Sequence, residues 1–219
     1  TVSSQVLDAF GMRAKTTAGM VRNTKKAVNE LAYSADATST GFKDLGIGMS
    51  YVGTAAKANK LSLAETASVM GVLSNNGLEA DKAGTGLRST INGLTSQINK
   101  IGKKNSIFDK LGIKKSEMLD AHGNLKSLST DMAVLYKHIQ EHSHGGAQAN
   151  GFFKSIFGTS GMNAAMILAK NSKEVQNLTK RTAEAGKSGT YVGKRAERNS
   201  ATAQRQMARA RQATEAFKM

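Results

Sequence analysis

The absence of proline most constrains what this chain can fold into. None of its 219 residues is proline, whereas average usage near 5% would give about eleven. Proline kinks or ends a helix because it lacks a backbone N–H and clashes with the preceding turn. Apolar residues also recur at alternating spacings of three and four along much of the chain, which places them on one face of a helix. These patterns predict an all-α fold.

The supply of apolar side chains is thin for a compact domain of this length. Only 39% of the residues are hydrophobic and 5% are aromatic. Helices with so little apolar surface extend outward or bury their apolar faces against partner subunits. We therefore expect a homo-oligomer. The absence of cysteine excludes a disulfide framework and thiolate metal sites.

No apolar run approaches the 18 or so residues that a transmembrane helix needs. The longest candidate, Met162 to Ala169, is less than half that length and contains Asn163. The chain begins with Thr1 and shows no signal-peptide pattern. We therefore expect it to be a piece, or a processed form, of a longer protein.

The chain is strongly basic, with 31 Lys and Arg against 16 Asp and Glu and a net charge of +15. Such a balance predicts attraction to nucleic acid, to an acidic membrane surface or to an acidic protein wall. The simpler alternative is that many of these charges only solvate helix faces.

The two ends of the chain have coiled-coil-like patterns. Residues 1–38 are predicted to form one helix with an apolar seam at 3/4 spacing over four heptads. This helix could form a coiled coil or could lie as a surface helix on the central domain. Residues 191–219 are predicted to form a basic helix rich in Ala and Arg, with a seam of small residues. Its arginines lie off the seam and are candidate contacts for a polyanion. They are Arg195, Arg198, Arg205, Arg209 and Arg211.

The middle of the chain, residues 39–190, is predicted to be a helical domain containing hairpins. Ser62 and Glu65 form an SxxE capping box that starts a helix, and Gly77 can end it in the left-handed conformation. Gly84 and Gly86 lie inside the following helix, where each costs about 1 kcal/mol relative to alanine. We therefore expect another element to pack closely against them.

Five further local predictions concern residues 106–174. Ser106 with Asp109, and Asn171 with Glu174, are candidate helix caps. The sequence DAHGN at 120–124 predicts a tight turn, with a short β-hairpin as one option. Residues 125–142 predict an amphipathic helix. Residues 150–170 hold three of the seven phenylalanines and are predicted to be core, with a membrane-active patch as the alternative.

The hairpin sequence LSLAETASVMGVLSNNGLEADKAGTGLRSTINGL, at 61–94, resembles the core region of siphophage tail tape measure proteins. LGI at 111–113, the DAHGN turn and FG at 157–158 follow in the family's order, so the resemblance covers roughly residues 40–190. The residues that carry it are Leu61, Ser62, Glu65, Gly77, Ala83, Gly84, Thr85, Leu87, Arg88, Gly112, Gly123, Asn124, Phe157 and Gly158.

The resemblance implies a structural role without a cofactor or catalytic site. Copies of such a protein, with a trimer favoured, lie in the lumen of the virion's tail tube or at the tail tip. They set tail length during assembly and leave when DNA is ejected. The implied partners are the tail tube protein and distal tail or tail-tip proteins, with transient contacts to genome DNA and the host membrane. The five arginines would face the tube.

Two other functions compete with this one. HIQEH at 138–142 matches the HxxEH pattern of inverted zinc peptidases, but no third ligand is identifiable, and adventitious metal binding or a solvated histidine cluster are the other interpretations. We assign no catalytic or metal-binding residue. The second alternative is a basic helical nucleic-acid-binding protein, which the shortage of aromatic side chains for base stacking disfavours.

Overall fold

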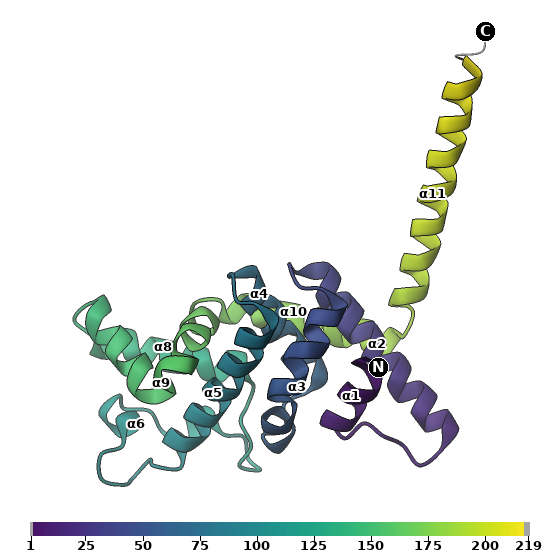
Figure 1. Cartoon of the computed structure of the whole chain (residues 1–219). Helices are drawn as coiled ribbons and strands as arrows, with labels where there is room; N and C mark the ends of the chain where they lie inside the picture. The colour runs from purple at the N-terminus through teal and green to yellow at the C-terminus, as the bar shows by residue number, and fades with distance from the viewer. Residues whose placement is uncertain (1, 217–219) are drawn as a thin grey trace.

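The structure is a computed structural model that describes the backbone of residues 2–216 and the side chains of residues 2–209. Over this range it is 78% helical and has no strands, so the predicted all-α class is confirmed (Figure 1). The helices are α1 (Val2–Ala9), α2 (Thr17–Ala37), α3 (Phe42–Ala58), α4 (Leu63–Asn75), α5 (Ala80–Ile98), α6 (Ile107–Lys110), α7 (Lys115–Met118), α8 (Leu128–His142), α9 (Gly146–Lys170), α10 (Ser172–Ser188) and α11 (Tyr191–Ala216).

The prediction of one long N-terminal helix is wrong. Helix α1 ends at Ala9, the chain turns through Gly11 at φ +63°, and α2 begins after Thr16, whose side chain accepts a hydrogen bond from the Gly19 N–H. Helix α1 folds back onto α3, where a Cβ on Gly46 would lie 2.5 Å from the Val2 side chain. Burial of the apolar face of α1 in the body therefore outweighs continuation of the heptad seam.

The predicted hairpin at 61–89 is present as α4 and α5. Ser62 Oγ accepts from the Glu65 N–H at 3.1 Å, and Gly77 takes φ +85° after α4 ends. The second half of the capping box is wrong, because Glu65 does not return to Ser62. Its Oε1 instead accepts from the Leu128 N–H at 2.6 Å, which ties α4 to the first turn of α8.

Helix α5 lies at the centre of the body, and its glycines allow two neighbours to approach. A Cβ on Gly84 would lie 2.5 Å from the Gly48 carbonyl oxygen of α3, and one on Gly86 would lie 2.8 Å from the Ala164 Cβ of α9. The expectation that an element packs closely against these glycines is confirmed. The apolar stripe of α5, including Leu87, is fully buried between the same neighbours.

The segment 150–170 belongs to the core, as predicted. Phe153, Ile156 and Phe157 are buried in the single large apolar cluster of the described residues. Gly158, at φ +67° and ψ −177°, places a kink inside α9. Residues on both sides of the kink pack against α5, since Cβ atoms on Gly93 and Gly86 would lie 2.8 Å from the Ile156 carbonyl oxygen and from the Ala164 Cβ, respectively.

One local prediction in the second half is confirmed and one needs correction. The tight turn at DAHGN is present, with the Gly123 N–H donating to the Asp120 carbonyl at 3.1 Å, and the pairing beside it is one isolated antiparallel bridge, between Leu119 and Leu125, rather than a β-hairpin. The predicted cap by Asn171 is wrong. Its side chain points back and donates to the Ile167 carbonyl at 2.9 Å, so it ends α9 and leaves α10 without a side-chain cap. By contrast, Ser106 caps α6 as predicted, accepting from the Asp109 N–H at 3.1 Å.

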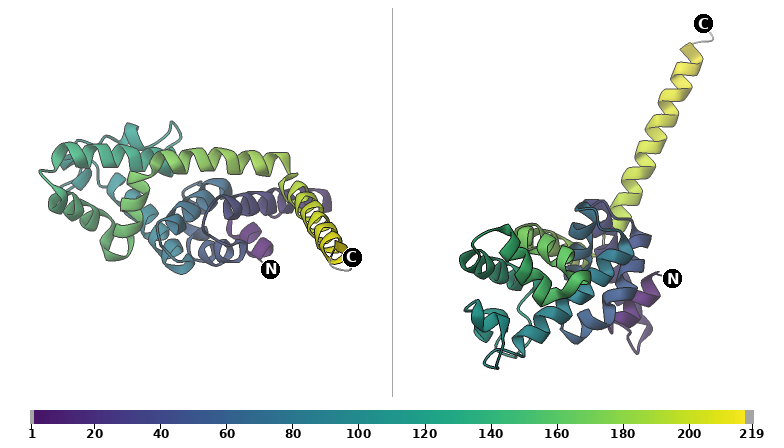
Figure 2. Two further views of the ribbon diagram at one scale, coloured as in Figure 1. Left: turned by 90° about the horizontal axis from the view of Figure 1, so that it is seen from above. Right: turned by 60° about the vertical axis from the view of Figure 1, so that its left-hand side comes forward.

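Helix α10 packs against α2, α4 and α8 and so connects the two ends of the body. After it, α11 projects from the body as a single straight helix, as Figures 1 and 2 show from three directions. Every described side chain from 192 to 209 is exposed. Among the described residues, no helix combines the length and apolar character that a bilayer crossing requires.

Candidate functional site: the base of the projecting helix

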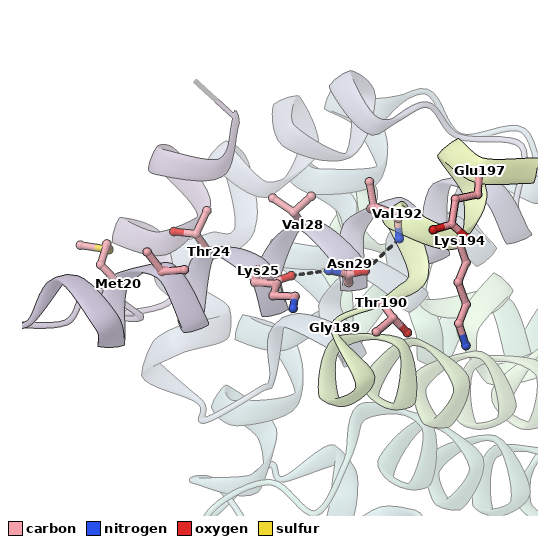
Figure 3. A pocket seen from close by; sticks show the side chains of 12 residues that line it. Met20, Thr24, Lys25, Val28, Asn29, Gly189, Thr190, Val192, Lys194 and Glu197 are labelled. Carbon is pink, nitrogen blue, oxygen red and sulfur yellow. Dashed lines mark hydrogen bonds between the residues drawn. The ribbon is translucent and has the colours of Figure 1, made fainter. Parts of the chain in front are cut away.

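The start of α11 is held on α2 by a buried asparagine. Gly189 ends α10 in the left-handed conformation at φ +62°, and the chain turns directly into α11. Asn29, only 3% exposed, accepts from the Val192 N–H at 3.0 Å and donates to the Lys25 carbonyl at 2.7 Å (Figure 3). First-turn N–H groups have no partner inside their own helix, so Asn29 satisfies one of them and fixes where α11 begins.

Four further side chains complete this attachment. Tyr191 donates its hydroxyl to Asp36 at 2.9 Å, and Arg195 forms an ion pair with the same carboxylate. The Tyr191 ring also meets the Tyr33 ring edge-on, with centroids 5.1 Å apart. Burial and the bond to Asp36 raise the pKa of Tyr191 above its ordinary value. We call these four residues, together with Asn29, the α11 mount.

An open apolar groove lies beside the mount, between α2 and the first turns of α11. Its volume is about 830 Å³. The apolar lining comes from Met20, Val21 and Val28 of α2 and from Val192 of α11 (Figure 3). Val21 is 61% exposed and Val192 is 37% exposed, which is unusual for aliphatic side chains on a folded body. We call this the junction groove.

A second hollow of about 540 Å³ adjoins the junction groove and shares Lys25 and Gly189 with it. Its rim is cationic, with Arg22, Lys25 and Lys26 from α2 and Lys187 from α10. Because like charges gather there, this end of the body has a positive local potential.

A buried carboxylate lies under this cationic rim. The Glu30 side chain is 2% exposed, its Oε2 has no hydrogen-bond partner in the described part of the chain, and Lys26 Nζ lies 3.9 Å from Oε1. Burial raises the pKa of Glu30 to about 7, although the Lys26 charge opposes the shift. Gly186 of α10 makes room for it, because a Cβ there would lie 2.4 Å from the Glu30 side chain. No sequence pattern points to this site, since Glu30 follows the charged pattern of a surface helix.

A second buried acidic site joins α4 to α8. Asp131 is fully buried, and neither carboxylate oxygen has a partner of hydrogen-bonding geometry among the described residues. Burial and the nearby Glu65 raise the pKa of Asp131 to about 8, against the opposing charge of Lys126. Burial also raises the pKa of Glu65, although its bond to the Leu128 N–H lowers it. The pKa of about 8 favours the protonated form of Asp131 at neutral pH.

The residues predicted from the family resemblance are spread through the body. They lie on α4, α5 and α9, next to the two ends of α4, and in the turns around α6, α7 and the β-bridge. Gly112 and Gly123 adopt φ +69° and +77° in these turns, while Ala83 and Leu87 are fully buried. Arg88 is exposed. The two buried residues serve packing, and the two glycines serve turn geometry.

The predicted polyanion contacts have different environments. Arg195 is engaged by Asp36 in the α11 mount. Arg198, Arg205 and Arg209 are exposed along α11. The side chain of Arg211 lies outside the described residues. Three of the five predicted arginines are thus presented on the projecting helix.

Both histidines of HIQEH have hydrogen-bonding partners within the fold. The possible ligand atoms of His138, Glu141 and His142 lie within 4.8 Å of one another. However, His138 Nδ1 lies 2.8 Å from the Leu111 carbonyl oxygen and Nε2 lies 3.1 Å from Glu117 Oε1. Since both neighbours are acceptors, a protonated His138 can donate to both. This arrangement ties α8 to the α6–α7 turn and leaves His138 no free nitrogen for a metal.

Residues 1–158 match the family described as phage-related minor tail protein, and the chain belongs to this family. It is 28% identical over 151 residues to the probable tape measure protein of Escherichia phage P2, across 68% of this chain and 18% of that protein. It is 30% identical over 129 residues to the tape measure protein of Pneumococcus phage Dp-1, across 59% of this chain and 10% of that protein.

These similarities confirm the resemblance stated from the sequence: the chain is a region of the phage tail tape measure type, with a structural role in the tail of the virion. The aligned part is less than a fifth of the length of either relative. No solved structure matches the chain.

Proposed function

We propose that this chain is a folded node of a tape measure protein that lies in the tail tube lumen or at the tail tip, sets tail length during assembly and is released when DNA is ejected. The observation that carries the proposal is α11, a 26-residue helix that contacts the body at its first turns and then projects away from it (Figure 1). At 1.5 Å per residue it spans roughly 39 Å. A continuous helix converts residue number directly into distance, which is what a ruler needs.

The body contributes differently to length. Its helices fold back on one another around a common core, so the number of residues there does not translate into axial distance. The body instead supplies a fixed end from which the helix is measured. The α11 mount supports this role, because Asn29, Tyr33 and Asp36 set the direction in which α11 leaves.

We further propose that copies of the chain associate, with a trimer favoured, through the small-residue seam of α11. Ala196, Ser200, Ala203 and Met207 form this seam, and all four are exposed in the single chain. Met207, at 63% exposure, is its largest apolar member. Small seam residues allow close helix approach but bury little apolar area, so association would be weak without confinement.

The exposed arginines of α11 would then face outward, toward the tube. Arg198, Arg205 and Arg209 lie off the seam, and an acidic wall of the tail tube protein would neutralise them. Distal tail or tail-tip proteins are the partners proposed for the body, with genome DNA and the host membrane as transient contacts during ejection.

Tail length is the measurement that tests the ruler function. A phage that encodes this chain with 28 helix-forming residues, four copies of a heptad, inserted after Ala201 should have tails longer by roughly 42 Å. The control carries the same insertion in the exposed loop at 102–105, where added residues leave the body without lengthening α11. Unchanged tail length with the α11 insertion would rule out the ruler function for this segment.

The alternative, a nucleic-acid-binding protein, is tested separately by salt. Phosphate neutralisation by α11 would give duplex binding that falls steeply with ionic strength. Replacing Arg198, Arg205 and Arg209 together by Gln should abolish this binding if DNA is the ligand. Loss of tail assembly with unchanged DNA affinity would instead support contact with tail proteins.

A further inference from the structure

The junction groove presents apolar side chains that nothing in the described chain covers. Val21 and Val28 are seven residues, or two helical turns, apart on α2, and Val192 of α11 lines the same groove. Figure 3 labels Val28 and Val192. Exposed aliphatic clusters in a concave surface mark interaction sites more often than isolated surface residues do. We propose that the junction groove binds an acidic amphipathic helix of a partner protein.

The shape of the groove favours a helix as the occupant. The groove lies between α2 and the start of α11, which projects away from the body after the turn at Gly189. A third helix can lie between α2 and α11 with apolar anchors at i, i+3 or i+4, and i+7. Asn29 holds Val192 in place through the 3.0 Å bond to its N–H. Since the walls are already positioned, little ordering of this chain accompanies binding, which favours affinity.

The charges around the groove favour an acidic occupant. Five cations surround the two adjoining hollows, whereas the acids among their described lining residues are Glu197 and the buried Glu30. Acidic residues on the polar face of a bound helix would meet these cations at the rim, which increases the rate of association and the specificity. The five cations are Arg22, Lys25, Lys26, Lys187 and Lys194.

Charge also disfavours a second copy of this chain in the groove. Helix α11 carries six Lys and Arg against two Asp and Glu, so it would repel the cationic rim. Nucleic acid fits less well than an acidic helix because the floor is aliphatic and would gain nothing from phosphates. The lining also has no aromatic ring on which a base could stack.

The test uses the 219-residue chain and fluorescein-labelled model peptides. The first peptide is an acidic helix with leucines on one face and glutamates on the others. The second has the same composition and charge, but its leucines are scattered around the helix. We expect the first to bind at least about tenfold more tightly than the second, because only one ordered apolar face can fill the groove. Equal affinity of the two peptides would overturn the proposal.

Variants then locate the binding site. Val21→Gln and Val192→Gln, tested separately, should each weaken binding of the first peptide by about fivefold or more, and Lys25→Gln should increase its dissociation constant at low salt. Ile47→Gln is the matched control, because Ile47 is 41% exposed on α3 outside the groove. Circular dichroism checks that each variant folds. Unchanged peptide affinity in both valine variants would contradict the proposal.

Two further ligands distinguish a site for an acidic helix from a site for other polyanions. A 20-base-pair DNA duplex and vesicles of phosphatidylcholine with phosphatidylglycerol are titrated against the same variants. A protein-helix site predicts that the valine variants lose peptide binding while their DNA and vesicle binding stays unchanged. If the valine substitutions weaken vesicle binding as strongly as peptide binding, the groove is a membrane contact and the proposal fails.

Discussion

Asn29 of α2 and Val192 of α11 are joined by a 3.0 Å hydrogen bond from the Val192 N–H to the Asn29 side-chain oxygen. These residues lie 163 positions apart in the sequence, yet this bond fixes the start of the one helix that leaves the body. A buried side chain on α2 therefore helps to hold the start of α11 on the body.

Asn29→Ala should release α11 from its fixed direction. The substitution removes the partner of the Val192 N–H and that of the Lys25 carbonyl, and an unpaired buried polar group costs about 1–3 kcal/mol. Because the chain has no cysteine, spin labels can be attached through Lys43→Cys and Gln204→Cys, at two exposed positions. Double electron–electron resonance should show a broader distribution of the distance between the two labels when Asn29→Ala is added than when Asn29 is kept.

The control for this experiment is Asn199→Ala, an exposed asparagine of α11. It should leave the label distances unchanged. An equally narrow distribution in Asn29→Ala would show that Tyr191 and Arg195 hold α11 without the asparagine.

Gly84→Ala should destabilise the body strongly. The added Cβ would lie 2.5 Å from the Gly48 carbonyl oxygen, and α3 and α5 would have to separate to admit it. Overpacking of this kind costs about 1–3 kcal/mol or more. Urea unfolding measured by circular dichroism gives the change in the free energy of unfolding.

Gly151→Ala provides the opposite result at a matched position. Gly151 is exposed inside α9, and a Cβ there would meet no atom within 4 Å. Replacing a helical glycine by alanine should stabilise the protein by about 0.5–1 kcal/mol. If Gly84→Ala and Gly151→Ala changed the free energy of unfolding in the same direction, the close contact of α3 with α5 would not explain the effect of Gly84→Ala.

The stability of the body should fall as pH rises from about 5 to 8.5. Glu30 and Asp131 have pKa values raised from 4.5 to about 7 and from 3.8 to about 8. The folded state therefore holds protons that the unfolded chain releases, and this stabilising contribution is lost as pH rises through the folded pKa values. Each tenfold difference in proton affinity corresponds to about 1.4 kcal/mol.

Urea unfolding at several pH values tests this dependence. Asp131→Asn should make the free energy of unfolding depend less on pH over the same range, because an amide of the same size does not ionise. Asp44→Asn, at an exposed acid in the first turn of α3, is the control. A stability that rises with pH in the wild-type chain would show that Glu30 and Asp131 are ionised in the fold.

His138→Ala should loosen the α6–α7 turn. The imidazole faces the Leu111 carbonyl and the Glu117 carboxylate, and its loss should cost about 1–2 kcal/mol. The pKa of Glu117 is lowered first by its bond from the Lys114 N–H and then by His138, so it should rise in the variant, as NMR titration of the carboxyl carbon would show. His142→Ala, at an exposed position, should leave both quantities nearly unchanged.

Local patterns determined most of the helices. The Ser62 and Ser106 caps, the left-handed Gly77 and the apolar spacing of α5 and α8 depend on residues close in sequence, so their physical causes can be read from the sequence. The all-α class followed from the same local rules and from the absence of proline. The tail tape measure resemblance followed from an ordered set of such elements.

Tertiary structure decided what the spacing of residues could not. A heptad pattern does not say whether its seam is covered by a partner or by the same chain, and burial of α1 against α3 divided the predicted N-terminal coiled coil into two helices. Capping rules paired Glu65 with its own helix, but the first turn of α8 offered a buried N–H at Leu128. The α11 mount and the junction groove depend on contacts between residues far apart in sequence, and such contacts exist only once the chain has folded.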